Sequence, residues 1–432
     1  MLCIGVLIME ACFLNLLTLA GIIEPDASIA DILIMIFSFS YAAYIVTAKK
    51  YKHAGKFMLG GYLFRVALLY WDIYCRDIYP LPSTGDIGTH WRGPLSYAHG
   101  LKVTRTAHKP FGIAIMMLGE QKLLIQFLMV LSSLITFWVV FKMLKELEIP
   151  EKIVNISMFL ISFLPLYAIH SSVFMMEAYP AMFSAVALLF FVRWYKGEGE
   201  INFWYTFIAA LAAAFFHTGT ITALGGYLLV RLIYTPKNGL KEGRFHFSYS
   251  ALLLGTFFMA IFIVLFRYVP MFSDKIPRIT SITQIDSGVN WDKRADSGYA
   301  RYVGRSDSIS SIIIYTPLRI IFFLFSPMPL PIQIRGLQDV IAFAFGSSFY
   351  MYTYYRAIRY ISNKKNKYRN LAISILIVGL VTAFVFGWGR ADVGTNARHR
   401  EKLVAVYVVL FAISMTDDRH KRHKRRRALT QS

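Results

Sequence analysis

The feature that most constrains this chain is the recurrence of long apolar runs along almost its whole length. A hydrocarbon core of about 30 Å takes about 20 residues of helix, so runs of this length are typical of membrane spans. The composition agrees, because 56% of the 432 residues are hydrophobic, 16% are charged and the mean hydropathy is +0.50. These values exclude a disordered chain, a coiled coil and a disulfide-rich secreted domain, and they argue against a large soluble enzyme. The sequence predicts an all-α polytopic membrane protein.

We expect roughly 11 to 13 transmembrane helices from the apolar segments. The candidate spans are residues 2–23, 29–48, 57–75, 121–141, 153–171, 178–194, 202–217, 219–234, 247–266, 337–356, 370–388 and 403–416. Residues 2–23 resemble a signal peptide, but no basic residue precedes them and Glu10 interrupts them, so we expect a first span. Residues 311–332 contain Pro317, Pro327, Pro329 and Pro331, and the stretch SPMPLPI cannot continue a helix. This stretch is therefore predicted to be re-entrant or interfacial, and to line a cavity.

Basic residues indicate the orientation, since cytoplasmic loops are enriched in Lys and Arg. The chain has 46 basic and 25 acidic residues, a formal net charge of +21. Acid-free basic blocks occupy residues 49–56 and 356–369, and seven of the last 14 residues are Lys or Arg. These blocks predict that both termini are cytoplasmic, and that the loops 76–110, 267–310 and 388–402 are exoplasmic.

The resulting organisation is one polytopic domain over residues 1–416 and a basic cytoplasmic tail over residues 417–432. The tail suits anionic lipid, which attracts such segments, better than nucleic acid, and no nucleic-acid partner is expected. Cys3, Cys12 and Cys75 make neither a disulfide framework nor a paired metal motif. The placement of the loops gathers polar residues on the exoplasmic side, which predicts a shared exoplasmic cavity.

The strongest polar cluster is GWGRADVGTNARHREKL, which lies between two spans. Its basic side chains are Arg390, Arg398, His399, Arg400 and Lys402. Arg398 and Lys402 are four residues apart and share one face of a helix. Guanidinium groups beside a helix N-terminus favour anions, and Arg matches phosphate oxygens bidentately. The cluster predicts a phosphate-binding site; an ordinary juxtamembrane basic patch is the alternative.

Three residues could serve as a catalytic base. Asp86 lies in PLPSTGDIGTHWRGPLSYAHG, with His90 and Arg92 as nearby substrate-binding candidates; alternatively it caps a short helix. Glu177 precedes a span, where a carboxylate is either functional or favoured by the helix dipole. His217 ends an Ala-rich span, and either transfers protons or is a hydrogen-bonded core residue. No D-x-D motif is present, so neither a metal nor another cofactor is expected.

Arg65 lies within a predicted span, in GGYLFRVALLY. A charged side chain at that depth is costly and needs a partner. Glu10, Asp72 and the cavity are alternatives that the sequence leaves open.

Three segments together resemble bacterial exopolysaccharide and O-antigen polymerases of the EpsG/Wzy-like group, and more distantly GT-C-type lipid-dependent glycosyltransferases. The segments are EAYPAMFSAVALLFFVRWYK, LAAAFFHTGTI and GTNARHREKLVAVYVVLFA. Glu177 matches the acid of an Arg-Glu pair in the family, but Met176 stands in the place of the arginine. Phe216-His217-Thr218 resembles the family's Phe-His motif, and residues 398–400 resemble its basic stretch. Asp86 resembles its first-loop acid.

The resemblance implies a glycosyltransferase of the bacterial inner membrane that takes glycan from undecaprenyl diphosphate on the exoplasmic face. Its partners would be the polyprenyl-linked donor, a glycan acceptor and membrane lipids, and contact with other polysaccharide export proteins is left open. Arg390, Arg398 and Arg400 would offset the charge of the diphosphate leaving group. The alternatives are a flippase for lipid-linked oligosaccharides or another transporter, and a non-catalytic membrane assembly protein. No internal repeat supports the transporter.

Overall fold

The computed structural model describes residues 27–48, 51–81, 84–103, 105–236, 244–245, 253, 308–330, 333–334, 336–389 and 393–416. The predicted span 2–23, nearly all of the span 247–266, the loop 267–307 and the tail 417–432 lie outside the described residues. In the described part the chain is helical, with one short antiparallel pair of strands, β1 (Tyr234–Thr235) and β2 (Arg244–Phe245).

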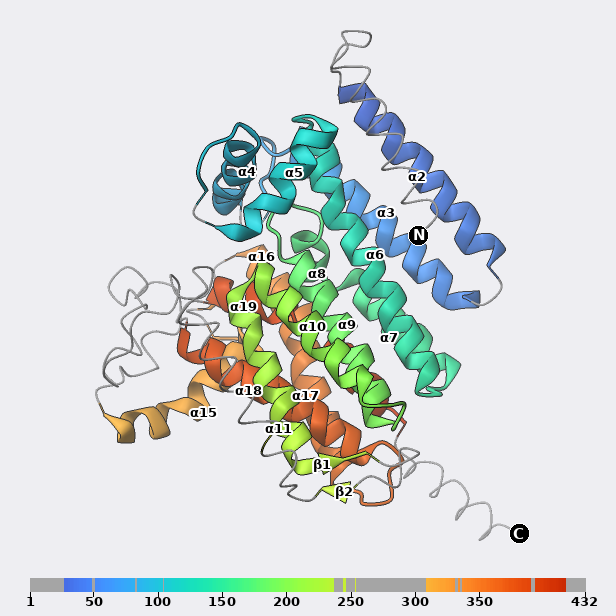
Figure 1. Ribbon diagram of the computed structural model, residues 1–432, viewed down its shortest axis with the longest axis vertical. Helices are drawn as coiled ribbons and strands as arrows, with labels where there is room; N and C mark the ends of the chain where they lie inside the picture. The colour runs from blue at the N-terminus through green and yellow to red at the C-terminus, as the bar shows by residue number, and fades with distance from the viewer. Residues whose placement is uncertain are drawn as a thin grey trace.

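Ten of the described helices make up the main bundle (Figure 1). They are α2 (Ala27–Thr47), α3 (Lys52–Tyr74), α6 (Lys122–Glu146), α7 (Glu151–Phe163), α9 (Ala178–Tyr195), α10 (Ile201–Phe216), α11 (Ile221–Ile233), α17 (Ser348–Ile361), α18 (Arg369–Gly389) and α20 (Val404–Ser414). The remaining helical segments are α4 (Thr84–Ala98), η1 (Thr106–His108), α5 (Lys109–Leu118), α8 (Pro165–His170), η2 (Thr218–Thr220), α15 (Ile309–Phe325), α16 (Leu337–Ile341), the π-helical η4 (Ala342–Ser347) and α19 (Val393–Glu401).

Four described helices are long and apolar enough to cross a membrane, by length and composition: Ile29–Thr47, Lys122–Glu146, Ala178–Tyr195 and Arg369–Trp388. Shorter apolar helices cover Ile201–Phe216, Thr218–Ile233, Ser310–Phe325 and Val404–Ser414. The predicted helical class is therefore confirmed, and the apolar helices suggest membrane association. The number of spans stays a prediction.

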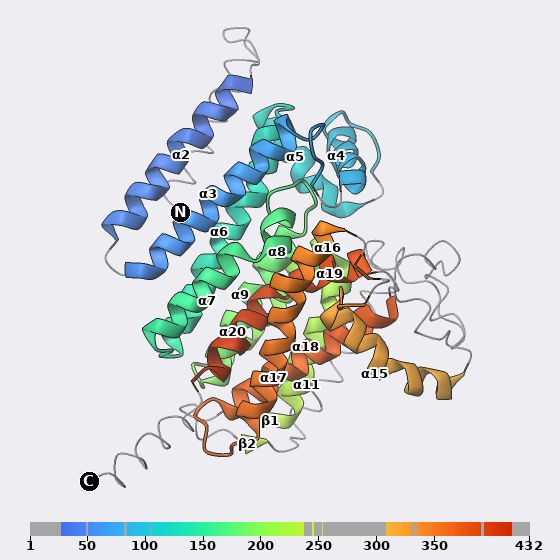
Figure 2. The same cartoon turned by 180° about the vertical axis from the view of Figure 1, so that it is seen from behind.

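The core of the bundle surrounds α20. All of its residues from Val404 to Ser414 are buried, as expected of a helix that is apolar on every side. It packs against α6, α7, α9, α17 and α18. By contrast, α2 lies at the edge of the bundle in both views and leaves Phe39 and Val46 78% exposed (Figures 1 and 2). Apolar residues exposed on an outer helix are consistent with a lipid-facing surface.

Three helices are interrupted within the bundle. Helix α7 ends before Pro165, which begins α8, and α10 ends at His217, whose backbone is extended. Helix α15 continues through Pro317 and ends at Ser326, directly before Pro327. The expectation that the stretch SPMPLPI cannot continue a helix is thus confirmed, because α15 ends at its first residue, Ser326. The backbone groups at these interruptions need partners inside the protein, since lipid offers none.

Different segments meet at the two ends of the bundle. At one end Tyr51 packs on Phe141, and Lys367 contacts Glu148 at 2.7 Å. At the other end α4 packs through Trp91 on the loop before α9, and α8 packs on α19. The site described next lies at this second end.

Candidate functional site

Glu177 is the carboxylate on which basic side chains from distant segments converge. It directly precedes α9 and follows Met176, whose left-handed φ of 60° is uncommon for a residue other than glycine. Its Oε1 lies 3.1 Å from Nε of Arg398, and its Oε2 lies 3.3 Å from Nζ of Lys402. Arg398 and Lys402 are four residues apart, so they reach the same carboxylate from one face.

Two histidines extend this cluster. Nζ of Lys402 lies 2.6 Å from Nδ1 of His399, and because the ammonium donates, this nitrogen accepts. The ring of His399 lies 4.7 Å from the ring of His217, and both rings pack on Phe386. Gly219 permits this packing, because a Cβ there would lie 2.7 Å from the Phe386 ring and 3.2 Å from the His217 ring. The structure therefore links the second and third sequence motifs directly.

His170 belongs to the same cluster and was missed in the sequence. It is the last residue of α8, is buried, and interacts electrostatically with Glu177, Arg398 and Lys402. Its Nδ1 has no hydrogen-bond partner among the described residues. The predicted span 153–171 placed His170 at the end of an unbroken helix. The signal that could have found it is Pro165, which interrupts that helix and turns His170 inward.

The electrostatics of the cluster favour an ionised carboxylate. Burial by itself raises the pKa of Glu177, but Lys402, Arg398, His217 and His170 outweigh it and lower that pKa to about 2. Glu177, His399 and Lys402 are each more than 90% buried, so these charges interact with little screening by solvent. Two cationic donors thus meet at one buried carboxylate, with imidazole rings beside them, and cationic N–H donors are the groups that bind oxyanions.

Arg400 faces the other way from Arg398, because residues two apart lie on nearly opposite sides of a helix. Its Nη1 donates to the carbonyl oxygens of Leu324 and Ser326, each at 2.8 Å, and its guanidinium stacks on Tyr350 at 4.1 Å. The structure therefore brings Arg398, His399 and Lys402 together with Glu177 and His217, and places Arg400 against α15 and α17.

The remaining candidates lie elsewhere or outside the described residues. Asp86 lies on α4, but its side chain, like all of Arg390, is outside the described part. The ring of His90 packs on His108, with centroids 6.3 Å apart, and the side chain of Arg92 is exposed. Helix α4 contacts the loop before Glu177 through Trp91 and Phe174, 5.6 Å apart. Their roles stay predictions.

Arg65 resolves an alternative that the sequence left open. Its guanidinium is fully buried and donates to the carbonyl oxygens of Gly61, Ser162 and Ile161, two of which end α7. Asp72 instead pairs with Arg76 at 2.7 Å, and Glu10 is outside the described residues. Arg65 therefore holds the interrupted end of α7.

Among the described residues, no group of three or more His, Cys, Asp or Glu side chains could hold a metal ion. Comparison with protein-family models, with curated proteins and with solved structures found no match. The resemblance to polysaccharide polymerases therefore depends on the three motifs.

Proposed function

We propose that this chain is a membrane-embedded glycosyltransferase of the polysaccharide-polymerase type, acting in exopolysaccharide, capsule or O-antigen biosynthesis. It takes glycan from a polyprenyl diphosphate donor on the exoplasmic face of the bacterial inner membrane. In this proposal roughly 11 to 13 helices cross the membrane, both termini are cytoplasmic, and the segment around residues 311–332 lines an exoplasmic cavity.

The observation that carries this proposal is one buried cluster: Arg398 and Lys402 pair with Glu177, His399 contacts Lys402, and His217 packs on His399. These residues come from three motifs that lie far apart in the sequence, and each motif was selected for its chemistry alone. Ordinary juxtamembrane charges remain exposed to water, because burying a charge costs free energy unless it is paired. A group of such charges around one buried carboxylate therefore favours a binding or catalytic role.

In the reaction, the acceptor hydroxyl oxygen forms a bond to the anomeric carbon, and the bond from that carbon to the diphosphate oxygen breaks. The diphosphate leaves with the electron pair, and Arg398 and Lys402 offset its developing charge. The hydroxyl proton passes to a base. Glu177, with its pKa of about 2, is a weak base and is better suited to orient the two cations.

His217 and Asp86 remain the candidates for the base. Asp86→Asn keeps the shape of the side chain and removes its basicity, so it should lower turnover about 100-fold or more if Asp86 is the base. Donor binding should persist, because Arg398 and Lys402 hold the diphosphate. Turnover and donor binding of the purified variant are measured side by side. Full turnover would assign the base to His217, and an equal loss of both would make Asp86 a donor ligand or a structural residue.

Lipid-linked glycans in a deletion strain test the proposed function itself. A polymerase is supported by single repeat units that accumulate on the exoplasmic face. Units trapped on the cytoplasmic face would instead indicate the flippase.

A further inference from the structure

Two buried arginines hold interrupted helices in the same way. Arg65 binds carbonyl oxygens at the end of α7, before Pro165, and Arg400 binds carbonyl oxygens at the end of α15, before Pro327. Both side chains are fully buried, and each stacks on a tyrosine ring, Tyr167 at 5.0 Å for Arg65 and Tyr350 at 4.1 Å for Arg400.

The two arginines differ in how many of their nitrogens the protein satisfies. All three nitrogens of Arg65 donate: Nε to Ser171 at 2.8 Å, Nη1 to Gly61 and Ser162, and Nη2 to Ile161. Only Nη1 of Arg400 donates, and its Nε and Nη2 have no hydrogen-bond partner among the described residues. A guanidinium has no acceptor of its own, so these nitrogens require one from elsewhere.

Further polar atoms without partners lie in the turn that Arg400 holds. Oγ of Ser326 and Nε2 of Gln333 are buried and have no hydrogen-bond partner in the described part of the chain. Gln333 belongs to this turn because its Oε1 accepts from the backbone N–H of Met328 at 2.6 Å. All of these atoms can donate. Buried donors left without an acceptor are costly, so a set of them indicates a missing acceptor-rich group.

Gly346 lies next to the guanidinium, and its missing side chain keeps carbon atoms away from Nη2. A Cβ at this position would have one neighbouring heavy atom within 4 Å, Nη2 of Arg400 at 3.6 Å. Gly346 lies in η4, a π-helical segment, and such segments are frequent at functional sites.

The carboxylate of the neighbouring Glu401 does not fully compensate the positive charge of Arg400. Oε1 of Glu401 lies 3.9 Å from Nε of Arg400, beyond hydrogen-bond distance, and Oε2 accepts from the hydroxyl of Tyr350. Burial raises the pKa of Glu401 to about 7, against the opposing effects of Arg400 and Tyr350. Burial therefore disfavours the charged form of Glu401, and an anion beside Arg400 would offset the guanidinium charge more fully.

We propose that Arg400, Ser326 and Gln333, with Gly346 beside the guanidinium, form a second oxyanion site, on the side of α19 opposite to Arg398, which binds a phosphoryl group. A phosphoryl group offers only acceptor oxygens and negative charge, and Arg binds it bidentately through two adjacent nitrogens. The proposal does not depend on catalysis at Glu177, because the two sites use different faces of α19.

Lysine substitutions at the two matched arginines test this site. Arg400→Lys keeps a buried cation that can donate to Leu324 and Ser326, but it loses the fork of Nε and Nη2. Arg65→Lys makes the same change where the protein already satisfies every nitrogen. The purified full-length chain in phosphatidylcholine nanodiscs is dialysed to equilibrium against labelled inorganic phosphate, and bound phosphate per chain is counted.

We expect two phosphates per chain in the wild type and in Arg65→Lys, and one in Arg400→Lys. Gly346→Ala leaves Arg400 in place but fills the space beside Nη2, so it should weaken the second site about tenfold while the unfolding temperature without phosphate is unchanged. The proposal is overturned if the Arg400→Lys protein binds as much phosphate as the Arg65→Lys protein. Arg400 would then only stabilise the end of α15.

Two further arms identify the source of the phosphoryl group and separate this site from the first. Phosphatidate in the nanodisc should displace phosphate from the Arg400 site if a lipid headgroup is the natural ligand, and should not if the ligand is soluble. Arg398→Lys should lose the other phosphate. If it binds two while Arg400→Lys binds one, the diphosphate site proposed at Arg398 fails and the site at Arg400 stands.

Discussion

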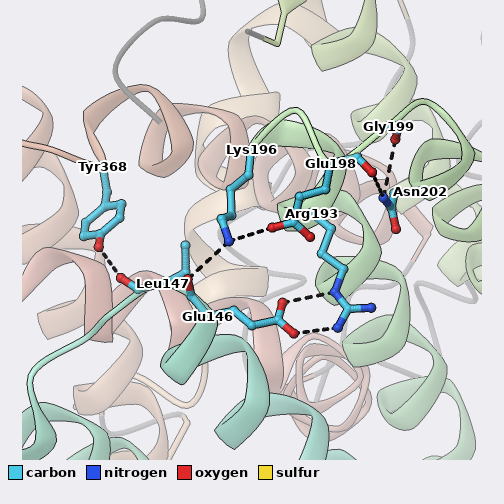
Figure 3. A network of polar contacts seen from close by, with 8 residues as sticks. All are labelled: Glu146, Leu147, Arg193, Lys196, Glu198, Gly199, Asn202 and Tyr368. Carbon is cyan, nitrogen blue, oxygen red and sulfur yellow. Dashed lines mark hydrogen bonds and ion pairs between the residues drawn. The ribbon is translucent and has the colours of Figure 1, made fainter. Parts of the chain in front are cut away.

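The two ends of α9 carry different kinds of charge cluster. At its start, Glu177 is shared by Arg398 and Lys402, and the group is almost wholly buried. At its other end, around Arg193, each cation has a carboxylate to itself (Figure 3). The pairs there are Arg193–Glu146, Lys196–Glu198, Arg231–Glu200 and Lys367–Glu148, at 2.5, 2.6, 3.4 and 2.7 Å.

Exposure separates the two clusters as well. Arg193 and Glu146 are each about one-fifth exposed, and Glu148 is 77% exposed. Ion pairs of this kind contribute little, since water and salt screen them. Lys196 and Tyr368 also donate to the backbone carbonyls of Glu146 and Leu147, which joins α6 to its neighbours (Figure 3). We infer that the cluster around Arg193 joins helix ends, whereas the cluster around Glu177 is the one that we propose for catalysis.

The largest expected effect is that of Glu177→Gln. The substitution leaves Arg398 and Lys402 buried without this carboxylate, and breaking a buried ion pair costs about 3–5 kcal/mol. We expect loss of glycan assembly and a much lower unfolding temperature. The matched control at the other end is Glu146→Gln, which should keep activity. Equal effects of the two substitutions on assembly and unfolding would remove the distinction between the clusters.

Arg398→Lys tests whether the geometry of the guanidinium matters or only its charge. Lysine keeps the charge next to Glu177 but cannot bind a diphosphate through two nitrogens. Turnover should fall on the order of 100-fold, as when one preorganised donor to developing charge is removed. Arg193→Lys is the control and should leave turnover unchanged. Full turnover of the Arg398→Lys protein would reduce the cluster to a generic basic patch.

Acid should separate the two ends through their carboxylates. The pKa of Glu177 falls from 4.5 to about 2, so its contribution to stability is present above pH 4.5 and is lost as the pH falls toward 2. The hydrogen bond from Lys367 also lowers the pKa of Glu148, but that pair is exposed and screened. Unfolding temperatures measured across this range should fall steeply in the wild type and in Glu148→Gln. A fall just as steep in Glu177→Gln would contradict this assignment.

The smallest expected effect is that of Lys367→Ala. Lys367 is 40% exposed and pairs with Glu148, which is more exposed still. Loss of such a pair should leave both turnover and unfolding temperature unchanged. A clear loss of activity would show that the end of the bundle around Arg193 does more than join helices.

The sequence by itself determined the helical class and the apolar helices that suggest membrane association, because apolar runs of this length are typical of membrane spans. It also selected Glu177, His217, Arg398 and Lys402, since these residue types are rare beside apolar spans and stand out there. The spacing of Arg398 and Lys402 placed both on one face without any knowledge of the partner.

Only the tertiary structure separated Arg398 from Arg400 and added His170. The sequence shows two arginines in one basic stretch, but what each contacts depends on which helices pack on the two sides of α19. One side meets the start of α9, and the other meets the interrupted end of α15. Those neighbours lie about 70 to 220 residues away in the chain, so their meeting is set by side-chain packing between distant helices, which local patterns do not encode.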